Sequence, residues 1–311
     1  MSNVLAHKVD FTVVIGVKNA NPNGDPLDSN RPRVNSDGLG EISDVAIKRK
    51  IRNRWQDMNL PVLVESQDRI PVGEPTNLRD RLKASEQVQK VLAGVTKKQP
   101  VDRYALMAAA NASWIDVRAF GQVLPFKSGS NDGLDGVSIP LRGPVSIQAA
   151  YSTDPIVIRE EQITKSINLE PGSAKGSDTM GTKAVVPFGV YVFNGSINIE
   201  LAQKSGFTQE DAAALKEALR TLFVNDSSAA RPEGSMAVIK LIWWEHDSQL
   251  GQLAPYLVHG ATKVKNPVAI QKGELFADDQ GRYQDADFTK VEVSVEDPNI
   301  EGLHVEVIDG F

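Results

Sequence analysis

Residues 9–26, VDFTVVIGVKNANPNGDP, contain the transition that decides the fold. Residues 9–18 are mostly β-branched and apolar, which predicts a buried strand, and the Asn, Pro and Gly residues behind them predict that it ends in a turn. The chain then stays polar to Glu41, far beyond the usual connection of about 4 to 6 residues. Because long ordered loops often carry function, this loop is the first candidate site.

Strand and helix patterns follow in an order that is typical of one fold. Ser43 is the expected N-cap of a helix over residues 43–58. Its buried face repeats at helical spacing: Ile47, Ile51, Trp55 and Met58. Further strands are expected at 143–152, 188–201 and 236–246, and a helix at 208–224 that begins with a Thr208 and Asp211 capping box. Without the insertions, the order is strand, helix, strand, strand, helix, strand, which predicts a ferredoxin-like (RRM-like) α+β fold. Its helices would cover one sheet face and leave the other free to bind.

Long insertions separate these elements. Residues 78–112 are expected to be mainly helical and basic, whereas residues 113–125, SWIDVRAFGQVLP, alternate like a strand. Residues 127–136 are typical of a loop, and the excursion at 153–187 is rich in Gly and Ser at its centre. Residues 260–311 alternate weakly, which predicts peripheral strands.

The composition excludes several classes of protein. The chain has 311 residues, of which 41% are hydrophobic and 24% charged, as in ordinary globular proteins. Zero cysteines exclude disulfides, thiolate nucleophiles and cysteine-ligated zinc, and only four histidines remain. No run of 18 apolar residues and no secretory signal pattern occurs, so we expect a cytoplasmic protein without membrane contact. We expect no cofactor and no metal.

The formal charge of −6 is unevenly distributed. Residues 1–130 contain 19 Lys and Arg against 14 Asp and Glu, whereas residues 131–311 contain 15 against 26. The front part is therefore at +5 and the rest at −11, with residues 273–311 alone at −9. Such asymmetry indicates nucleic-acid contact by the basic part. An acidic solubilising tail on a neutral body is the alternative explanation.

The helix at 43–58 concentrates the positive charge. Opposite its apolar stripe it has five cations within seven positions: Lys48, Arg49, Lys50, Arg52 and Arg54. Lys48, Arg49 and Arg52 share one side by their spacing, and arginine engages phosphate as a fork while lysine acts as a point charge. Only Asp57 follows near them, so pairing within the helix does not explain the cluster. We interpret this face as phosphate-binding rather than merely solvated.

The loop at 19–35 offers donors for the same ligand. Asn19, Asn21, Asn23, Arg31 and Arg33 are interleaved with Gly24 and three prolines. Glycine allows close approach of the backbone, and Asn and Arg donate to phosphate or 2′-hydroxyl oxygens. The same loop contains three carboxylates that could instead ligate a hard cation, although their spacing does not match an EF-hand: Asp25, Asp28 and Asp37.

Signals for catalysis and for base stacking are weaker. Glu245 and Asp247 flank His246, but neighbours on a strand point to opposite faces, so they form no triad. No GxSxG, HExxH, Walker or dinucleotide-binding pattern occurs. Residues 188–197, FGVYVFNGSI, are similar to the aromatic strand of RNA-recognition modules but lack its leading basic residue, and these aromatics also suit a core. Met180 could insert between neighbouring bases as an apolar wedge.

Several of these segments together resemble one family. NPNGDP at 21–26, RPR at 31–33 and GEISDVAIKRKIRN at 40–53 resemble the opening of the repeated backbone subunit of type I-C CRISPR surveillance complexes (Cascade), in the RAMP superfamily. IDVRAFGQVLP, GPVSIQ and TMGTKAVVPFGVYVFNG are similar to later blocks of that family. The resemblance spans most of residues 9–246 and does not include the acidic tail.

The resemblance implies a non-catalytic subunit with a ferredoxin-like palm, a helical finger insertion and a thumb hairpin. It implies several copies in a helical filament along the spacer of a CRISPR RNA, with other Cascade subunits, so that the exposed bases pair with target DNA. The implied division is 1–58 for the first half of the palm with the RNA-binding loop and helix, 59–140 for the fingers, 141–154 for a palm strand, 155–186 for the thumb, 187–250 for the second half of the palm and 251–311 for the acidic extension.

Carried over onto this sequence, the RNA contacts of the family fall on the loop, the basic helix, the insertion and the thumb. The expected RNA-binding residues are Asn19, Asn21, Asn23, Arg31, Arg33, Ser43, Lys48, Arg49, Arg52, Arg118, Lys127, Lys165, Met180 and Lys183. Related type III subunits cut RNA with an Asp of the corresponding loop, whereas type I backbones do not cut. The alternatives are a metal-assisted ribonuclease that uses the loop carboxylates and a scaffold protein that binds no RNA.

The residues agree with this implication on physical grounds. A protein that holds a guide should contact phosphate and ribose and leave the base edges free, because pairing reads the sequence. Identical subunits repeated along a strand need a heterologous interface that does not close on itself. The +5 front part and the −11 rest of the chain could supply part of that complementarity.

Overall fold

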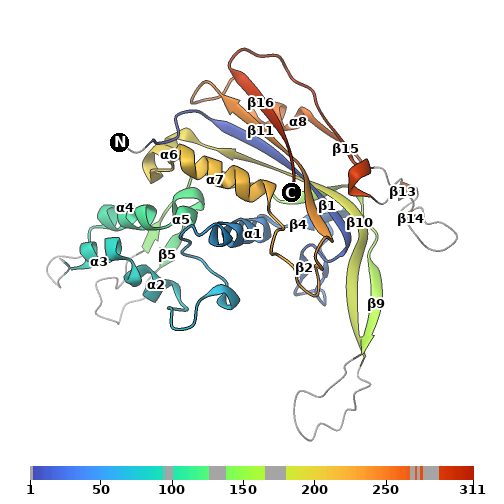
Figure 1. Ribbon diagram of the computed structural model, residues 1–311, viewed down its shortest axis with the longest axis horizontal. Helices are drawn as coiled ribbons and strands as arrows, with labels where there is room; N and C mark the ends of the chain where they lie inside the picture. Colours follow the sequence, from blue (N-terminus) through green and yellow to red (C-terminus); the bar gives the residue numbers. More distant parts are fainter. Residues whose placement is uncertain are drawn as a thin grey trace, which may run out of the picture.

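A large antiparallel sheet forms the centre of the protein. The computed structural model describes residues 3–93, 95, 101–125, 138–164, 180–266, 270–271, 274–275 and 287–311. The strands of the sheet lie in the order β16-β11-β1-β10-β8-β4, and β7 and β9 also pair with β10 (Figure 1). The expected mixed α and β class with an antiparallel sheet is confirmed.

Strand β1 (Val9–Ala20) lies in the middle of the sheet, as its apolar sequence predicts. It is antiparallel to both neighbours, β10 (Met180–Ile197) and β11 (Met236–His246). β11 has the predicted boundaries. β10 begins at Met180 rather than at residue 188, because its first residues pair with β9 (Arg159–Thr164) in a hairpin that extends away from the sheet (Figure 1).

The expected strand at 143–152 is divided in two. β7 (Val145–Ile147) and β8 (Ala150–Pro155) both pair with β10, but the register changes by one residue between them. β4 (Leu39–Ile42) pairs with β8 and ends the sheet on this side. The opposite edge is β16 (Leu303–Asp309), a strand from the weakly alternating tail.

The first face of the sheet is covered by the two predicted helices. α1 (Asp44–Asp57) and α7 (Gln209–Arg220) pack their apolar stripes on alternate residues of β1 and β10. The Thr208 and Asp211 capping box is present, but α7 ends at Arg220, before the expected residue 224. Two aromatic side chains of β10, Tyr191 and Phe193, are at most 1% exposed here and belong to the core. α6 (Ile199–Ser205) follows β10 directly, where the sequence predicts the end of a strand.

The second face of the sheet is also covered, which corrects the expectation that it is free to bind. The cover is a C-terminal layer, residues 253–266 and 287–300, whose apolar side chains pack on Val14, Ile242 and Trp244. Its contact with β1 is so close that a Cβ on Gly16 would lie 2.4 Å from the Phe288 ring. The elements of this layer are α8 (Pro255–Gly260), β12 (Thr262–Lys265), η2 (Phe288–Lys290) and β15 (Glu292–Val295).

The insertion after α1 has an apolar core of its own. Residues 113–125 are not one strand: α5 (Ile115–Phe120) is helical and only β5 (Val123–Pro125) is extended. The Asp116 carboxylate accepts the backbone N–H of Leu63 at 2.8 Å and that of Val64 at 3.2 Å, and Gly121, at φ 75°, ends the helix. These long-range contacts override the alternating pattern.

The remaining short elements complete the described fold. They are β2 (Gly24–Asp25), β3 (Arg31–Pro32), η1 (Gln67–Arg69), α2 (Leu78–Ala84), α3 (Glu86–Leu92), α4 (Arg103–Ser113), β6 (Ser138–Pro140), β13 (Ile270–Gln271) and β14 (Glu274–Leu275). Within the described ranges, no helix combines the length and the apolar character that crossing a membrane requires.

Candidate nucleic-acid interface

The polar loop after β1 is tied to the start of α1. The Asn23 Oδ1 atom accepts hydrogen bonds from the backbone N–H and from the hydroxyl of Ser43, both at 2.9 Å. The Ser43 Oγ atom accepts the backbone N–H of Ala46 at 3.3 Å, which confirms Ser43 as the N-cap of α1. The loop and the basic helix therefore lie together at one end of the sheet, as the sequence predicts.

The same loop is tied to the hairpin of β9 and β10. Arg31 forms an ion pair with Glu160 on β9. Arg159 donates to the Asn19 Oδ1 atom at 3.2 Å, and Asn19 itself has a left-handed backbone, at φ 51°. These contacts bring two predicted groups of residues, those of the loop and those of the thumb, to one side of the molecule.

Two other loop residues are used mainly inside the loop. Asn21 is 4% exposed and donates to the Asn30 carbonyl at 2.7 Å. Arg33 forms an ion pair with Asp25 at 3.5 Å. Asn21 and Arg33 therefore stabilise the conformation of the loop itself.

The cationic side of α1 lines a groove. Lys48 pairs with Asp44 at 2.9 Å, one turn earlier in the helix. Arg49 donates to the Val64 carbonyl at 2.8 Å. Burial lowers the pKa of the Arg49 guanidinium, and the charge of Arg52 lowers it further. The groove has a volume of about 370 Å³ and is lined by Val45, Lys48, Arg49, Arg52, Phe120, Gly121, Gln122, Val123 and Leu141.

Arg52 is oriented by the insertion. Its Nε–H donates to the fully buried Asp116 carboxylate at 3.0 Å, and its guanidinium lies 5.1 Å from the centre of the Phe120 ring. An Nε contact leaves the terminal nitrogens of the fork available to a phosphate. Lys48, Arg49 and Arg52 are thus brought together as predicted. The groove residues Phe120, Gly121 and Gln122 were missed, because the sequence there was interpreted as a strand.

Two expectations about α1 are corrected. Lys50 is not on the solvent face: its side chain is 7% exposed and forms an ion pair with Asp226. Burial lowers the pKa of Lys50 to about 8, although Asp226 opposes this shift. Pairing within the helix does occur, since Lys48 pairs with Asp44 and Arg54 with Asp57.

The remaining predicted contacts divide into three groups. Arg118 forms a two-point ion pair with Asp211, at 2.9 and 2.8 Å, and therefore joins α5 to α7 instead of facing the α1 groove. Met180 is 69% exposed at the start of β10. Lys127 and Lys165 lie outside the described residues.

Lys183 lies at a second, smaller hollow between the loop and the hairpin. Its volume is about 240 Å³, and its lining comes from three distant segments: Asn21, Ser29, Asn30, Ile163, Thr182, Lys183, Ala184, Ala229 and Ala230. The hollow therefore has lining residues from both the loop after β1 and the β9–β10 hairpin.

The loop carboxylates occupy different surroundings. Asp25 pairs with Arg33 and accepts the backbone N–H of Leu27 at 3.0 Å, and Asp28 lies 3.9 Å from Arg31. Asp37 belongs to the turn that Asn35 closes. Across the part of the chain that the structure describes, no three His, Asp or Glu side chains are grouped in a way that could hold a metal ion.

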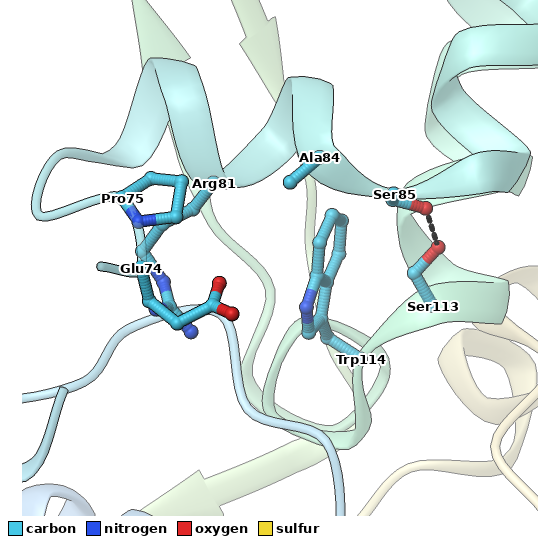
Figure 2. A pocket seen from close by; sticks show the side chains of 7 residues that line it. All are labelled: Glu74, Pro75, Arg81, Ala84, Ser85, Ser113 and Trp114. Atoms are coloured by element: carbon cyan, nitrogen blue, oxygen red, sulfur yellow. Dashed lines mark hydrogen bonds between the residues drawn. The ribbon is translucent and has the colours of Figure 1, made fainter. Parts of the chain in front are cut away.

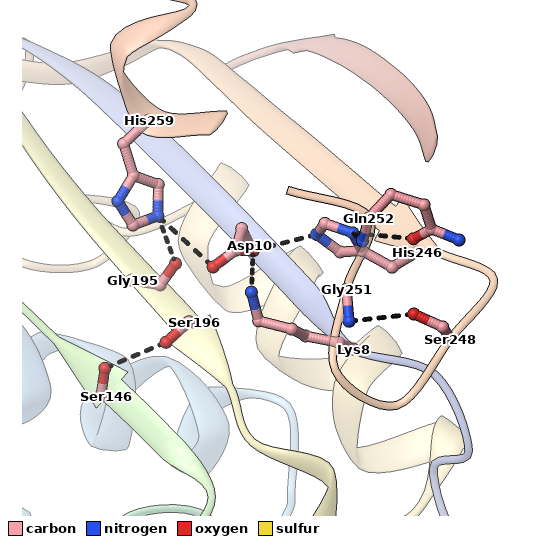
Figure 3. Close-up of polar contacts among 10 residues, drawn as sticks. All are labelled: Lys8, Asp10, Ser146, Gly195, Ser196, His246, Ser248, Gly251, Gln252 and His259. Atoms are coloured by element: carbon pink, nitrogen blue, oxygen red, sulfur yellow. Dashed lines mark hydrogen bonds and ion pairs between the residues drawn. The ribbon is translucent and has the colours of Figure 1, made fainter. Parts of the chain in front are cut away.

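A buried polar cluster beneath α8 was missed by the sequence analysis (Figure 3). The Asp10 carboxylate accepts from Lys8 at 2.7 Å and from His246 at 3.0 Å, and His259 on α8 lies 3.6 Å from its other oxygen. Burial alone would raise the pKa of Asp10, but the hydrogen bonds from His246 and Lys8 and the nearby His259 hold it well below its ordinary value. The alternation of β1 marks Asp10 as a polar residue, but no local pattern links it to these partners.

The chain matches one protein family over most of its length. The model of the family described as CRISPR-associated protein Cas7 matches residues 7–294. The chain belongs to this family. The Cas7 match includes the loop, α1, the insertion and the β9–β10 hairpin, and it ends within β15, before the edge strand β16.

Individual relatives are more distant. CRISPR-associated protein Cas7 of Haloferax volcanii is 26% identical over 221 residues, which make up 67% of this chain and 62% of that protein. A chain of a CRISPR RNA-guided surveillance complex in a pre-nicking state is 14% identical, with a TM-score of 0.43 over 76% of this chain and 78% of that chain. A chain of another CRISPR RNA-guided surveillance complex is 15% identical, with a TM-score of 0.40 over 76% and 68%.

Proposed function

We propose that this Cas7 family member is a non-catalytic backbone subunit that binds the spacer of a CRISPR RNA in a type I-C Cascade complex. The observation that carries the proposal is the groove beside Lys48, Arg49 and Arg52, inside the segment that the family matches. Three cations on one helix suit a phosphate backbone, and RNA held by its backbone would keep its base edges free to pair. Target DNA is then recognised through the guide, and other Cascade subunits complete the complex.

The finer description of the fold supports this role. The strands β11, β1, β10 and β8 lie side by side in the order expected of a ferredoxin-like palm, with α1 and α7 on one face. The insertion with its own core corresponds to the fingers, and the β9–β10 hairpin to the thumb. Because the second face is covered, the RNA would follow the loop and α1 instead of crossing the open surface of the sheet.

The test is guide binding by a variant that loses two groove cations. Lys48→Ala with Arg49→Ala should weaken binding of single-stranded RNA about tenfold, equally for unrelated spacer sequences, and should lower the slope of log affinity against log salt by about 1.4. Lys263→Ala with Lys265→Ala, two exposed lysines on β12, removes the same charge far from the groove and should change neither value. Equal effects of both variants would refute the groove as the binding site, and unequal losses across spacers would refute backbone recognition.

We further propose that copies assemble head to tail along one guide. The basic front part and the acidic remainder of the chain are charge-complementary, and a repeated heterologous contact needs two different faces. Doubling the salt concentration should reduce assembly on long RNA, measured by sedimentation. Unchanged assembly would remove the electrostatic part of this proposal.

The ribonuclease alternative has its own experiment. The protein and its Asp25→Ala, Asp28→Ala, Asp37→Ala variant would be incubated with guide and target RNA in the presence of Mg²⁺. We expect no cleavage by either protein. Cleavage that depends on these carboxylates would overturn the assignment, and co-purification of a protected RNA of fixed length would exclude a scaffold that binds none.

A further inference from the structure

Asp116 of α5 is a fully buried carboxylate between α1 and the insertion. Its Oδ1 atom accepts the backbone N–H of Leu63, and its Oδ2 atom accepts the backbone N–H of Val64 and, at 3.0 Å, the Nε–H of Arg52. A buried carboxylate is costly unless hydrogen bonds and a counter-charge satisfy it, and Asp116 has both. The counter-charge is Arg52, a cation that also lines the α1 groove.

The segment of residues 62–64, called the strap below, fixes Asp116 in place. The first two strap carbonyls accept hydrogen bonds from Arg81 of α2, at 3.0 and 2.8 Å. Arg81 lines the pocket beneath α2 that Figure 2 shows. The third strap carbonyl, that of Val64, accepts from Arg49 at 2.8 Å. Both arginines of the α1 groove are therefore tied to the strap, one directly and one through Asp116.

Arg52 is held by two residues of α5. Its Nε–H meets Asp116, and its guanidinium lies 5.1 Å from the centre of the ring of Phe120, one helical turn after Asp116. The Phe120 ring in turn stacks on Trp55 of α1, with 5.3 Å between the ring centres. The Nε contact is the only hydrogen bond between Arg52 and a described residue. Its two terminal nitrogens therefore remain for a ligand.

We propose that Asp116 is a positioning residue for RNA binding, which holds Arg52 so that its terminal nitrogens meet a phosphate of the guide in the α1 groove. The inference rests on the proposed function and gives a role in it to a buried residue of the insertion that does not touch RNA itself. A guanidinium binds phosphate through two parallel N–H groups only in one orientation, and ordering a free side chain on binding lowers the affinity.

A positioning role and a merely neutralising role predict opposite effects of Asp116→Asn. The variant removes a negative charge beside the groove, so RNA affinity should rise if Asp116 only neutralises Arg52. Asparagine keeps one oxygen for the Leu63 N–H but offers no second acceptor to the Arg52 Nε–H, which leaves Arg52 free to turn. With Asp116 as a positioning residue, the affinity falls although the protein becomes more positive.

The experiment measures oligouridine binding to the full-length protein by fluorescence anisotropy at several salt concentrations. Asp116→Asn should bind about tenfold more weakly and lower the slope of log affinity against log salt by about 0.7, the value of one lost phosphate contact. Asp44→Asn is the matched control, because it removes the same charge from the exposed partner of the neighbouring cation Lys48. It should bind RNA at least as tightly as wild type. In an Arg52→Ala background, Asp116→Asn should cause no further loss, because the side chain that it positions is absent.

Arg52→Lys is a second test, and its result does not depend on whether Asp116→Asn folds. Lysine keeps the charge, but its single nitrogen cannot bond to Asp116 and present a fork to phosphate at the same time, so affinity should again fall about tenfold. Unchanged or higher affinity in Asp116→Asn or Arg52→Lys, an equal loss in Asp44→Asn, or a further loss in the Arg52→Ala background would overturn the inference.

The variant Lys48→Ala with Arg49→Ala separates this inference from the proposed function. If that variant leaves oligouridine binding intact, the proposed function fails, and the role of Asp116 fails with it. If that variant weakens binding and Asp116→Asn does not, the groove stands and only the role of Asp116 is refuted.

Discussion

The two faces of the main sheet are both buried, but by different means. The first face is covered by α1 and α7, two regular helices with apolar stripes and side-chain caps. The second is covered by the short elements of the C-terminal layer, together with the polar cluster of Lys8, Asp10, His246 and His259. The first face also has one buried ion pair, between Lys50 of α1 and Asp226, whereas in the cluster of the second face His259 of α8 lies 3.6 Å from Asp10 of β1.

The comparison bears on function as well as stability. In an RNA-recognition module, the sheet face opposite the helices binds RNA. Here that face is closed, and the cations gather at the end of the sheet where the loop meets α1. The difference between the faces therefore favours an edge-bound RNA backbone over bases stacked on the sheet.

The largest expected effect comes from opening the first face. Trp55 is fully buried, its ring centre lies 5.3 Å from that of Phe120, and its indole N–H donates to the Ala214 carbonyl at 3.3 Å. Trp55→Ala should lower the free energy of unfolding by about 4 kcal/mol. Urea denaturation would measure it. A loss below about 1 kcal/mol would mean that α1 is not the main cover of this face.

The polar cluster of the second face should be nearly as sensitive. Asp10→Asn leaves Lys8 without its buried counter-charge and should cost about 3 kcal/mol in the free energy of unfolding. Asp247→Asn, which removes an exposed partner of His304, should cost less than about 0.5 kcal/mol. Hydrogen exchange should rise first in α8, and a uniform rise across α1 would contradict the local role of the cluster.

The stability difference between wild type and Asp10→Asn should depend on pH in one direction. Because the pKa of Asp10 is held below its ordinary value of 3.8, its contribution to stability is fully present above about pH 4 and is lost as the pH falls through the lowered pKa. The stability difference between wild type and Asp10→Asn should therefore shrink only in strong acid. A difference that shrinks near pH 6 would assign the effect to histidine titration instead.

Lys50 is the corresponding buried charge of the first face. Its pKa is lowered to about 8 from an ordinary 10.5, so the folded protein releases its proton more readily than the unfolded chain. Wild type should gain stability relative to Lys50→Met as the pH rises from about 8 to about 10.5, by at most about 1.4 kcal/mol per pH unit. Thermal unfolding at several pH values measures this, and a constant difference would contradict the burial of the charge.

The smallest effect is expected at the start of α1. Ser43→Ala removes the cap and the hydroxyl partner of Asn23, at a cost of about 1 kcal/mol in the free energy of unfolding. Ser43→Thr keeps the oxygen and should restore most of it. RNA affinity that falls with Ser43→Ala and returns with Ser43→Thr would show that the cap also positions the groove.

The regular elements were the most predictable part of the fold. α1 with its Ser43 cap, the capping box of α7 and the boundaries of β11 follow from local spacing, because such patterns depend on residues within a few positions of each other. Residues 113–125 were predicted wrongly, because the helix there is stabilised through Asp116 by backbone N–H groups about fifty positions earlier. No local pattern contains that information.

The sequence predicted which residue types form the candidate site, but it did not predict all of their ion-pair partners. The cluster of Lys48, Arg49 and Arg52 follows from helical spacing, and the groove confirms that they share one side. Arg118 has the same chemistry in the sequence, yet the tertiary structure places it beside Asp211 of α7, with which it pairs. The number of charged residues can be read from the sequence, but which of them form ion pairs depends on the tertiary structure.

The sequence by itself determined the order of strands and helices, the side of α1 that carries positive charge and the family resemblance, because each depends on neighbouring residues. Only the tertiary structure decided that the C-terminal layer closes the second face of the sheet and that Lys50 and Arg118 are paired inside the protein. The physical reason is that burial and ion pairing depend on which distant segments meet. Alternation of apolar and polar residues along a strand predicts which face is buried, but it does not predict which segment of the chain covers that face.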